Sequence, residues 1–233
     1  MRSHVVEREV SVWVLQAMEN ACEYDESLSH VLNKLLWLGN VALVGGAVRD
    51  FVVEAPEARI AAALGPLVTG RTRLGGFRAR TLGREAPFDV WPLQSTWMFT
   101  KRPDMLQALF NYPKTVPYSA DSGVVSLTSG QFYGNGFLDT LTTGVLKLNV
   151  DRFGLEYLES PERVDGLLAR SLELCARYSY QIGPCVAKAL YDRAEEGLTR
   201  ESLAYAYFKT YSRTLSWSWR EFLPEKLCLA LSW

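Results

Sequence analysis

The stretch Val41-Ala-Leu-Val-Gly-Gly-Ala-Val-Arg-Asp50 decides the fold of this chain. Four apolar residues followed by two glycines predict a buried strand that breaks sharply into the start of a helix. Glycines at such a break let the backbone approach a ligand closely and adopt a positive φ, which a Cβ would oppose. The first N–H groups of the helix would point into the same gap, where a phosphate is a natural occupant. Arg49, in the first helical turn, would add a fork of donors to that anion.

The composition of the 233-residue chain is that of an ordinary globular protein, with 48% hydrophobic and 22% charged residues. This length allows one large domain or two small ones around a real core. The formal net charge is −1, so any surface that binds nucleic acid must be a local patch. No apolar run approaches the roughly 20 residues that span a bilayer, and the N-terminus lacks a signal-peptide pattern. We therefore expect a cytoplasmic protein without a membrane partner.

Cysteine and histidine give no sign of a zinc site. The cysteines are scattered without a Cys-x-x-Cys pair, so we expect buried free thiols at Cys22, Cys175, Cys185 and Cys228. Both histidines, His4 and His30, stand in the N-terminal stretch without neighbours that suggest metal binding or catalysis. We expect them to be surface or satisfied histidines.

Helical patterns flank the central strand on both sides. Apolar residues recur at spacings of three and four from Val10 to Leu38, and Tyr24-Asp-Glu-Ser27 interrupts them, which predicts two helices or one broken helix. After the glycine pair, Pro56 suits a first helical turn, and a helix is predicted over 57–64. A strand, a glycine turn and a helix in this order are typical of an α/β or α+β domain.

Charged side chains mark two further predicted strands. Arg78 and Arg80 alternate with Phe77 and Ala79, as on a half-exposed strand. This is either a solvated face or a basic edge for a triphosphate or an RNA backbone. Asp89 interrupts the apolar run 88–93, where an unpaired carboxylate is costly to bury. It is either a residue at the rim of the sheet or a cation ligand.

The pattern changes from strands to helices in the last third of the chain. We expect strands at 124–127, 131–133 and 145–150, connecting helices at 96–99 and 105–110, and longer helices at 164–178, 185–194 and 202–211. The expected organisation is N-terminal helices over 1–40, a head domain over 41–150 and a helical domain over 151–233.

Gly45-Gly46-Ala47-Val48-Arg49-Asp50 resembles the Gly-Gly-x-Val-Arg-Asp signature of the head domain of bacterial poly(A) polymerases and CCA-adding tRNA nucleotidyltransferases. Later stretches agree in order, so that the resemblance spans roughly residues 35–195: Leu74–Arg78, Phe88–Trp91, Phe110-Asn111, Val124–Leu127, Phe137–Thr140 and Ser160–Tyr178. The resemblance implies an α+β fold, namely a polymerase β-like nucleotidyltransferase head with a mixed sheet, followed by a small helical domain.

The resemblance also implies an activity: template-independent, Mg²⁺-dependent addition of nucleotides from an NTP (ATP or CTP) to an RNA 3′ end, tRNA-like in kind. It implies that Gly45 and Gly46 cradle the triphosphate, and that Asp50 orients Arg49 or caps its helix. The implied site consists of Asp89 as catalytic residue and metal ligand, with Gly45, Gly46, Arg49, Asp50, Arg78 and Arg170 binding nucleotide. The oligomeric state stays open.

One departure from the family pattern concerns the metal site. The family carries an Asp-x-Asp pair that holds two cations, and none occurs between Asp50 and Asp89. In one explanation, a segment that carries the first acid is absent from this chain, so that Phe51–Val53 is the end of the acidic strand. In the other, the protein is a degenerate nucleotide- or RNA-binding module or a regulatory partner. A third reading is an α/β domain with a chance Gly-Gly turn.

Overall fold

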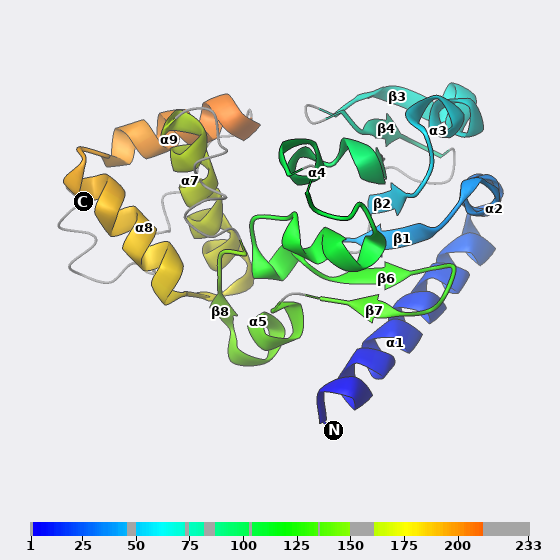
Figure 1. Ribbon diagram of the computed structural model, residues 1–233, viewed down its shortest axis with the longest axis horizontal. Helices are drawn as coiled ribbons and strands as arrows, with labels where there is room; N and C mark the ends of the chain where they lie inside the picture. The colour runs from blue at the N-terminus through cyan, green and yellow to red at the C-terminus, as the bar shows by residue number, and fades with distance from the viewer. Residues whose placement is uncertain are drawn as a thin grey trace. The chain divides into compact units, whose positions relative to one another are not determined.

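The computed structural model describes residues 2–45, 50–72, 75–81, 87–102, 104–134, 136–149 and 161–211 (Figure 1). Two compact units make up the chain. The first contains Met1–Val116 and Asp121–Asn135, and the second contains Pro117–Ala120 and Gly136–Trp233. The division therefore falls earlier than the boundary near 151 that the sequence suggested, since residues 136–149 join the helices that follow them.

A seven-stranded mixed sheet forms the centre of the first unit, in the order β3-β4-β5-β2-β1-β6-β7. Only β2 and β5 run parallel, and the other neighbours are antiparallel. The strands are β1 Val41–Val44, β2 Asp50–Val53, β3 Val68–Arg71, β4 Phe77–Ala79, β5 Phe88–Pro92, β6 Val124–Ser126 and β7 Phe132–Tyr133. The mixed sheet with flanking helices confirms the expected fold class.

Successive side chains of a strand point to opposite faces of the sheet. Since every residue of Val41–Val44 and of Phe51–Val53 is buried, both faces of these central strands are covered. Leu43 and Phe51 face a core shared with three helices, α1 (Arg2–Tyr24), α2 (Glu26–Leu38) and α3 (Glu57–Leu64). Val44 and Val52 face a second core with Leu109 and other residues from the segments after β5. Those segments contain η2 Leu93–Ser95, α4 Trp97–Lys101 and η3 Leu109–Lys114, while η1 Gly65–Leu67 links α3 to β3.

The expected break between the N-terminal helices is confirmed, and Asp25 causes it. Its Oδ1 accepts a hydrogen bond from the Leu28 N–H at 3.0 Å, which caps the start of α2. Its Oδ2 accepts one from the Thr81 hydroxyl at 2.5 Å in a buried position. The cap therefore also fastens α2 to the segment that follows β4.

The sequence predicts a helix directly after the glycine pair. This prediction is wrong at Asp50, which begins strand β2. Asp50 pairs with Val44 in the antiparallel ladder between β1 and β2. Residues 46–49 lie outside the described part. The connecting helix expected over 105–110 is also absent from its described residues, where a 3₁₀ helix begins only at Leu109.

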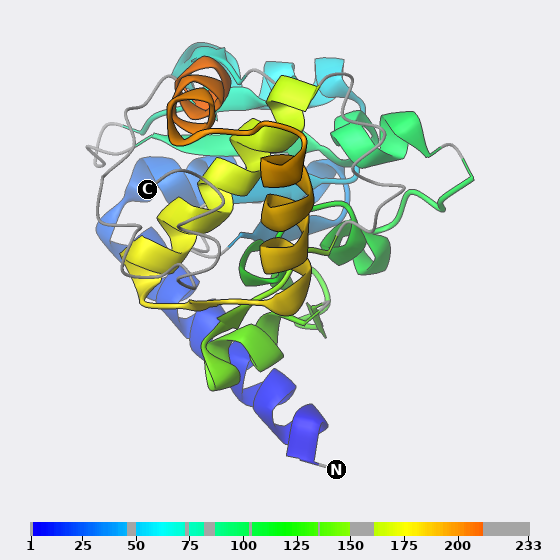
Figure 2. The same cartoon turned by 90° about the vertical axis from the view of Figure 1, so that its left-hand side faces the viewer.

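Three helices form the core of the second unit: α7 (Pro161–Tyr178), α8 (Pro184–Glu195) and α9 (Arg200–Tyr211) (Figure 2). Buried Leu168, Leu172 and Leu190 are among the residues of this core. A small parallel pair of strands, β8 (Val145–Leu146) and β9 (Gln181–Ile182), lies beside it. The helices expected after residue 161 are thus confirmed.

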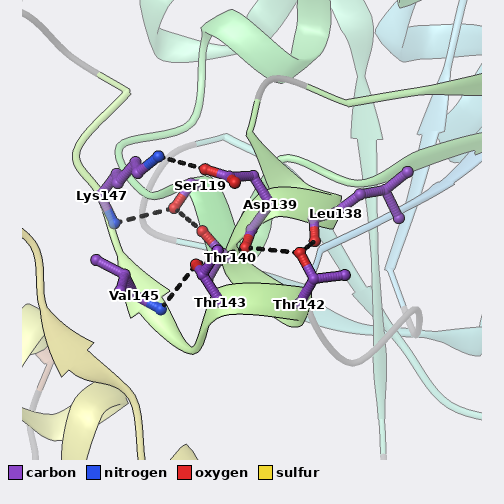
Figure 3. Close-up of polar contacts among 8 residues, drawn as sticks. All are labelled: Ser119, Leu138, Asp139, Thr140, Thr142, Thr143, Val145 and Lys147. Carbon is purple, nitrogen blue, oxygen red and sulfur yellow. Dashed lines mark hydrogen bonds and ion pairs between the residues drawn. The ribbon is translucent and has the colours of Figure 1, made fainter. Parts of the chain in front are cut away.

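Polar contacts join residues 119, 139–140 and 147 at the start of the second unit (Figure 3). The Ser119 and Thr140 hydroxyls lie 2.5 Å apart, which ties η4 (Ser119–Asp121) to α5 (Phe137–Thr143). The Lys147 N–H donates to Ser119 Oγ at 3.0 Å, and the Lys147 ammonium pairs with Asp139. These contacts explain why residues 136–149 belong to this unit.

The cysteines only partly fit the expectation of buried thiols. Cys175 is buried, and burial raises the pKa of its thiol to about 12. Cys22 is half-buried and Cys185 is exposed, whereas Cys228 lies outside the described residues. Within the described ranges, no helix is both long and apolar enough to cross a bilayer.

Candidate functional site

Two carboxylates, Asp50 and Asp89, lie side by side at one end of the sheet. They precede the first paired residues of the parallel strands β2 and β5, where Phe51 is opposite Val90. The Asp89 N–H donates a hydrogen bond to Asp50 Oδ1 at 3.2 Å. Both residues are half-buried, as expected for side chains at the rim of a sheet.

Gly45 closes the neighbouring strand at the same end, since Val44 is opposite Asp50. Its φ is 87°, and a Cβ added there would meet nothing within 4 Å among the described residues, so none of their side chains plugs this corner. With strands about 4.8 Å apart, β1 lies roughly 10 Å from β5. The Gly45 N–H donates to the Gly123 carbonyl at 3.2 Å, so it is already engaged and is not a ready donor for a phosphate.

Arg78 reaches this rim from the strand on the other side of β5. It is opposite Asp89 in the antiparallel ladder, and its Nε donates to Asp89 Oδ1 at 3.2 Å. The Arg78 side chain is 52% exposed and that of Asp89 21% exposed. Ion pairs this open to water contribute at most about 1 kcal/mol, so an anion or cation that enters the site can displace the contact.

Tyr112 adds an electrostatic feature that the sequence did not indicate. Burial, together with the nearby Asp50 and Asp121 carboxylates, raises the pKa of its phenol far above the ordinary value. The hydroxyl therefore stays protonated in a region of negative charge. No local pattern marks Tyr112 or Asp121, because only the folded chain brings η3 and η4 close to Asp50.

The two adjacent carboxylates fit a cation that is shared with a substrate. Mg²⁺ prefers oxygen ligands, and proteins often hold it through one or two carboxylates plus substrate phosphates. No group of three or more potential metal ligands occurs in the part of the chain that the structure describes. Asp50 and Asp89 therefore fit such a shared cation and do not make an all-protein cage.

Three other residues were predicted for the site: Gly46, Arg49 and Arg170. Gly46 and Arg49 lie outside the described residues. Arg170 belongs to the second unit, where its Nη1 pairs with Glu173 at 2.5 Å. Burial alone would raise the pKa of Glu173, but hydrogen bonds from Tyr207 and Arg170 and nearby positive charge lower it below the usual value. The Tyr207 hydroxyl on α9 donates to Glu173 on α7, and Arg170 pairs with the same carboxylate.

Comparisons with known proteins show the fold of this chain. No family model and no curated protein sequence matches it. The Bacillus stearothermophilus CCA-adding enzyme in complex with CTP aligns with a TM-score of 0.57 and 12% identity, over 79% of this chain and 47% of that one.

Two more solved structures align similarly. A CCA-adding enzyme with CTP aligns with a TM-score of 0.54 and 18% identity, over 79% of this chain and 48% of that one. A tRNA nucleotidyltransferase complexed with a primer tRNA and an incoming ATP analog aligns with a TM-score of 0.52 and 16% identity, over 83% of this chain and 56% of that one. The head fold is therefore that of CCA-adding enzymes, and the chain spans about half the length of these proteins.

Proposed function

We propose that this chain is a nucleotidyltransferase that transfers nucleotides from an NTP, ATP or CTP, to the 3′ end of a tRNA-like RNA. One observation carries the proposal: Asp50 and Asp89 converge on adjacent strands, at the open end of the sheet where Gly45 ends β1. Paired carboxylates at such a position are the residues that phosphoryl transfer requires for binding cations.

The proposed roles follow from the contacts at the rim. Asp50 and Asp89 would hold a divalent cation, for which we propose Mg²⁺; when bound, the cation neutralises triphosphate charge and activates the attacking hydroxyl. Arg78 would leave Asp89 and pair with a phosphate, which its planar fork of donors suits. Gly45 would keep the corner open. Phosphate contacts from Gly46 and Arg49, and contacts of Arg170 with the base or acceptor, stay predictions.

The position of Asp50 changes the role suggested for it by the sequence. It is a strand residue beside Asp89, so we propose it as a metal ligand and not as the cap of a helix. Phe51–Val53 continues as a buried strand next to β5. This arrangement supports the explanation in which this segment is the end of the acidic strand of the family pattern.

A second candidate function is a catalytically degenerate nucleotide- or RNA-binding module. The ion pair between Arg78 and Asp89 favours it, because the carboxylate is already neutralised without a cation. The lack of a third ligand among the described residues points the same way. Such a module would bind nucleotide through Arg78 and its neighbours without transferring it.

The proposal is tested by incubating the protein with labelled ATP or CTP, Mg²⁺ and total tRNA. We expect incorporation into RNA that Asp50→Asn and Asp89→Asn each reduce by at least about 100-fold, as is typical for loss of an electrostatic catalytic group. Asp192→Asn, which neutralises an exposed carboxylate on α8, is the matched control and should retain activity. No incorporation by the wild-type protein, together with nucleotide binding that ignores Mg²⁺, would establish the binding module instead.

A further inference from the structure

A surface groove lies between α2 and α3, away from the carboxylates. Its volume is about 400 Å³. Six residues line it: Lys34, Trp37, Leu38, Arg59, Ala62 and Ala63. The floor is apolar, because leucine and alanine side chains contribute it, and the rim carries an indole and two cations. We call it the α2–α3 groove.

The fold does not require Trp37. Helix α2 buries Leu28, Val31 and Leu35 against the core, and Trp37 lies two residues beyond Leu35, on the opposite side of the helix. The Trp37 side chain is 88% exposed. Because its ring is exposed and lines the groove, Trp37 can offer a flat apolar face to a ligand.

The two cations of the groove are available to a ligand. Lys34 is one turn before Trp37 on α2, Arg59 comes from α3, and both are exposed. Within the described ranges, no carboxylate lines the groove or pairs with either cation. Glu57, two residues before Arg59 on α3, is paired with Arg71 at 2.5 Å and does not neutralise them.

We propose that the α2–α3 groove binds single-stranded RNA, with a base stacked on Trp37 and phosphates paired with Lys34 and Arg59. A nucleotide strand carries flat aromatic groups and regular negative charges together, and an indole and two cations in one groove complement both. An acidic peptide would satisfy the cations but leave the indole in water. The choice of RNA over single-stranded DNA rests on the proposed function.

The groove and the carboxylate rim are at opposite ends of the central strands. Helix α2 ends at Leu38, just before β1 begins, and α3 starts just after β2 ends. Asp50 and Gly45 are at the other ends of these strands. Strands of four residues extend about 13 Å, so RNA held in the groove would leave the nucleotide site accessible.

Fluorescence anisotropy with a labelled single-stranded adenosine 12-mer RNA, without NTP or divalent cation, tests this inference. We expect Trp37→Ala to raise the Kd for this RNA about 5- to 150-fold, which corresponds to the loss of one stacked base. The logarithm of the RNA association constant falls linearly with the logarithm of the salt concentration, and Lys34→Gln and Arg59→Gln should each reduce the magnitude of this slope by about 0.7. Trp13→Ala, which removes a 69% exposed indole from α1, is the matched control and should change neither quantity.

Three outcomes would overturn the inference: equal effects of Trp37→Ala and Trp13→Ala, no RNA binding by the wild-type protein, or displacement of the RNA by a polyglutamate peptide of equal charge. The binding assay contains no NTP and no divalent cation, so it separates this inference from the proposed function. If the groove variants weaken RNA binding while wild-type protein transfers no nucleotide, the groove stands and the transferase fails. If the wild-type protein transfers nucleotide and the groove variants bind RNA normally, the proposed function stands and the groove proposal fails.

Discussion

The ion pair between Arg78 and Asp89 makes the proposed site sensitive to one substitution, Arg78→Gln. The variant keeps a polar side chain on β4 but removes the charge that lies 3.2 Å from Asp89 Oδ1. A cation that binds Asp89 must compete with Arg78, and an exposed pair of this kind is worth about 0.2–1 kcal/mol. Removing the competitor should therefore raise divalent-cation affinity up to about fivefold.

The same substitution should weaken nucleotide binding. If Arg78 pairs with the triphosphate, its loss removes a hydrogen bond between charged groups, worth about 1.5–3 kcal/mol. ATP affinity in the presence of Mg²⁺ should then fall about 10- to 150-fold. The opposite signs of the two effects distinguish a competing residue from a merely structural one.

Isothermal titration calorimetry with Mn²⁺ and with Mg²⁺–ATP measures both quantities on one protein. Arg80→Gln is the control, since Arg80 is exposed and follows β4 by one residue. It should alter cation affinity less than Arg78→Gln does. The reasoning is refuted if Arg78→Gln weakens cation binding, or if it leaves both affinities unchanged.

Three stability predictions follow from packing and titration. Asp25→Ala removes the α2 cap and the buried bond from Thr81, so the free energy of unfolding measured in urea should fall by about 2–3 kcal/mol. Gly76→Ala places a Cβ 2.7 Å from the Trp91 ring, so overpacking should cost about 1–3 kcal/mol in the same assay, and an unchanged midpoint would contradict the contact. Glu173 has a lowered pKa in the folded protein, so its contribution to stability is present above its ordinary pKa of 4.5 and is lost as pH falls through the lower folded value. As the pH falls below 4.5, the Tm of Glu173→Gln should therefore decrease less than the Tm of the wild-type protein. An unchanged dependence of Tm on pH would refute the assignment.

Local signals predicted those parts of the fold that depend on local physics. The buried strand Val41–Val44 and the helices on either side of Asp25 follow from apolar periodicity and from a capping residue. The sequence also suggested Asp89 as a rim residue or ligand, because an acid inside an apolar strand requires a reason. These features need no knowledge of which strands pair.

The arrangement of the site depends on pairing across long separations, which no local pattern contains. Asp50 was expected in a helix, because Gly-Gly after a strand is typical of a strand-to-helix turn. Its proximity to Asp89 results from the parallel pairing of β2 with β5, across 39 residues of sequence. Tyr112 was missed for the same reason, since its electrostatic environment exists only after η3 and η4 come close to Asp50.

The two candidate functions differ in how cation and nucleotide binding are coupled. Two carboxylates, one of them paired with Arg78, should hold a cation weakly until triphosphate oxygens complete its ligands. In a transferase, Mg²⁺ must then raise ATP affinity by the same factor as ATP raises Mg²⁺ affinity. In a binding module that keeps Arg78 on Asp89, that factor is one. Because Mg²⁺ and ATP also associate in solution, the comparison is made against Asp89→Asn, which shares that background. A Mg²⁺-dependent gain in ATP affinity that is equal in the wild-type protein and in Asp89→Asn would place the cation elsewhere and end the case for catalysis at this rim.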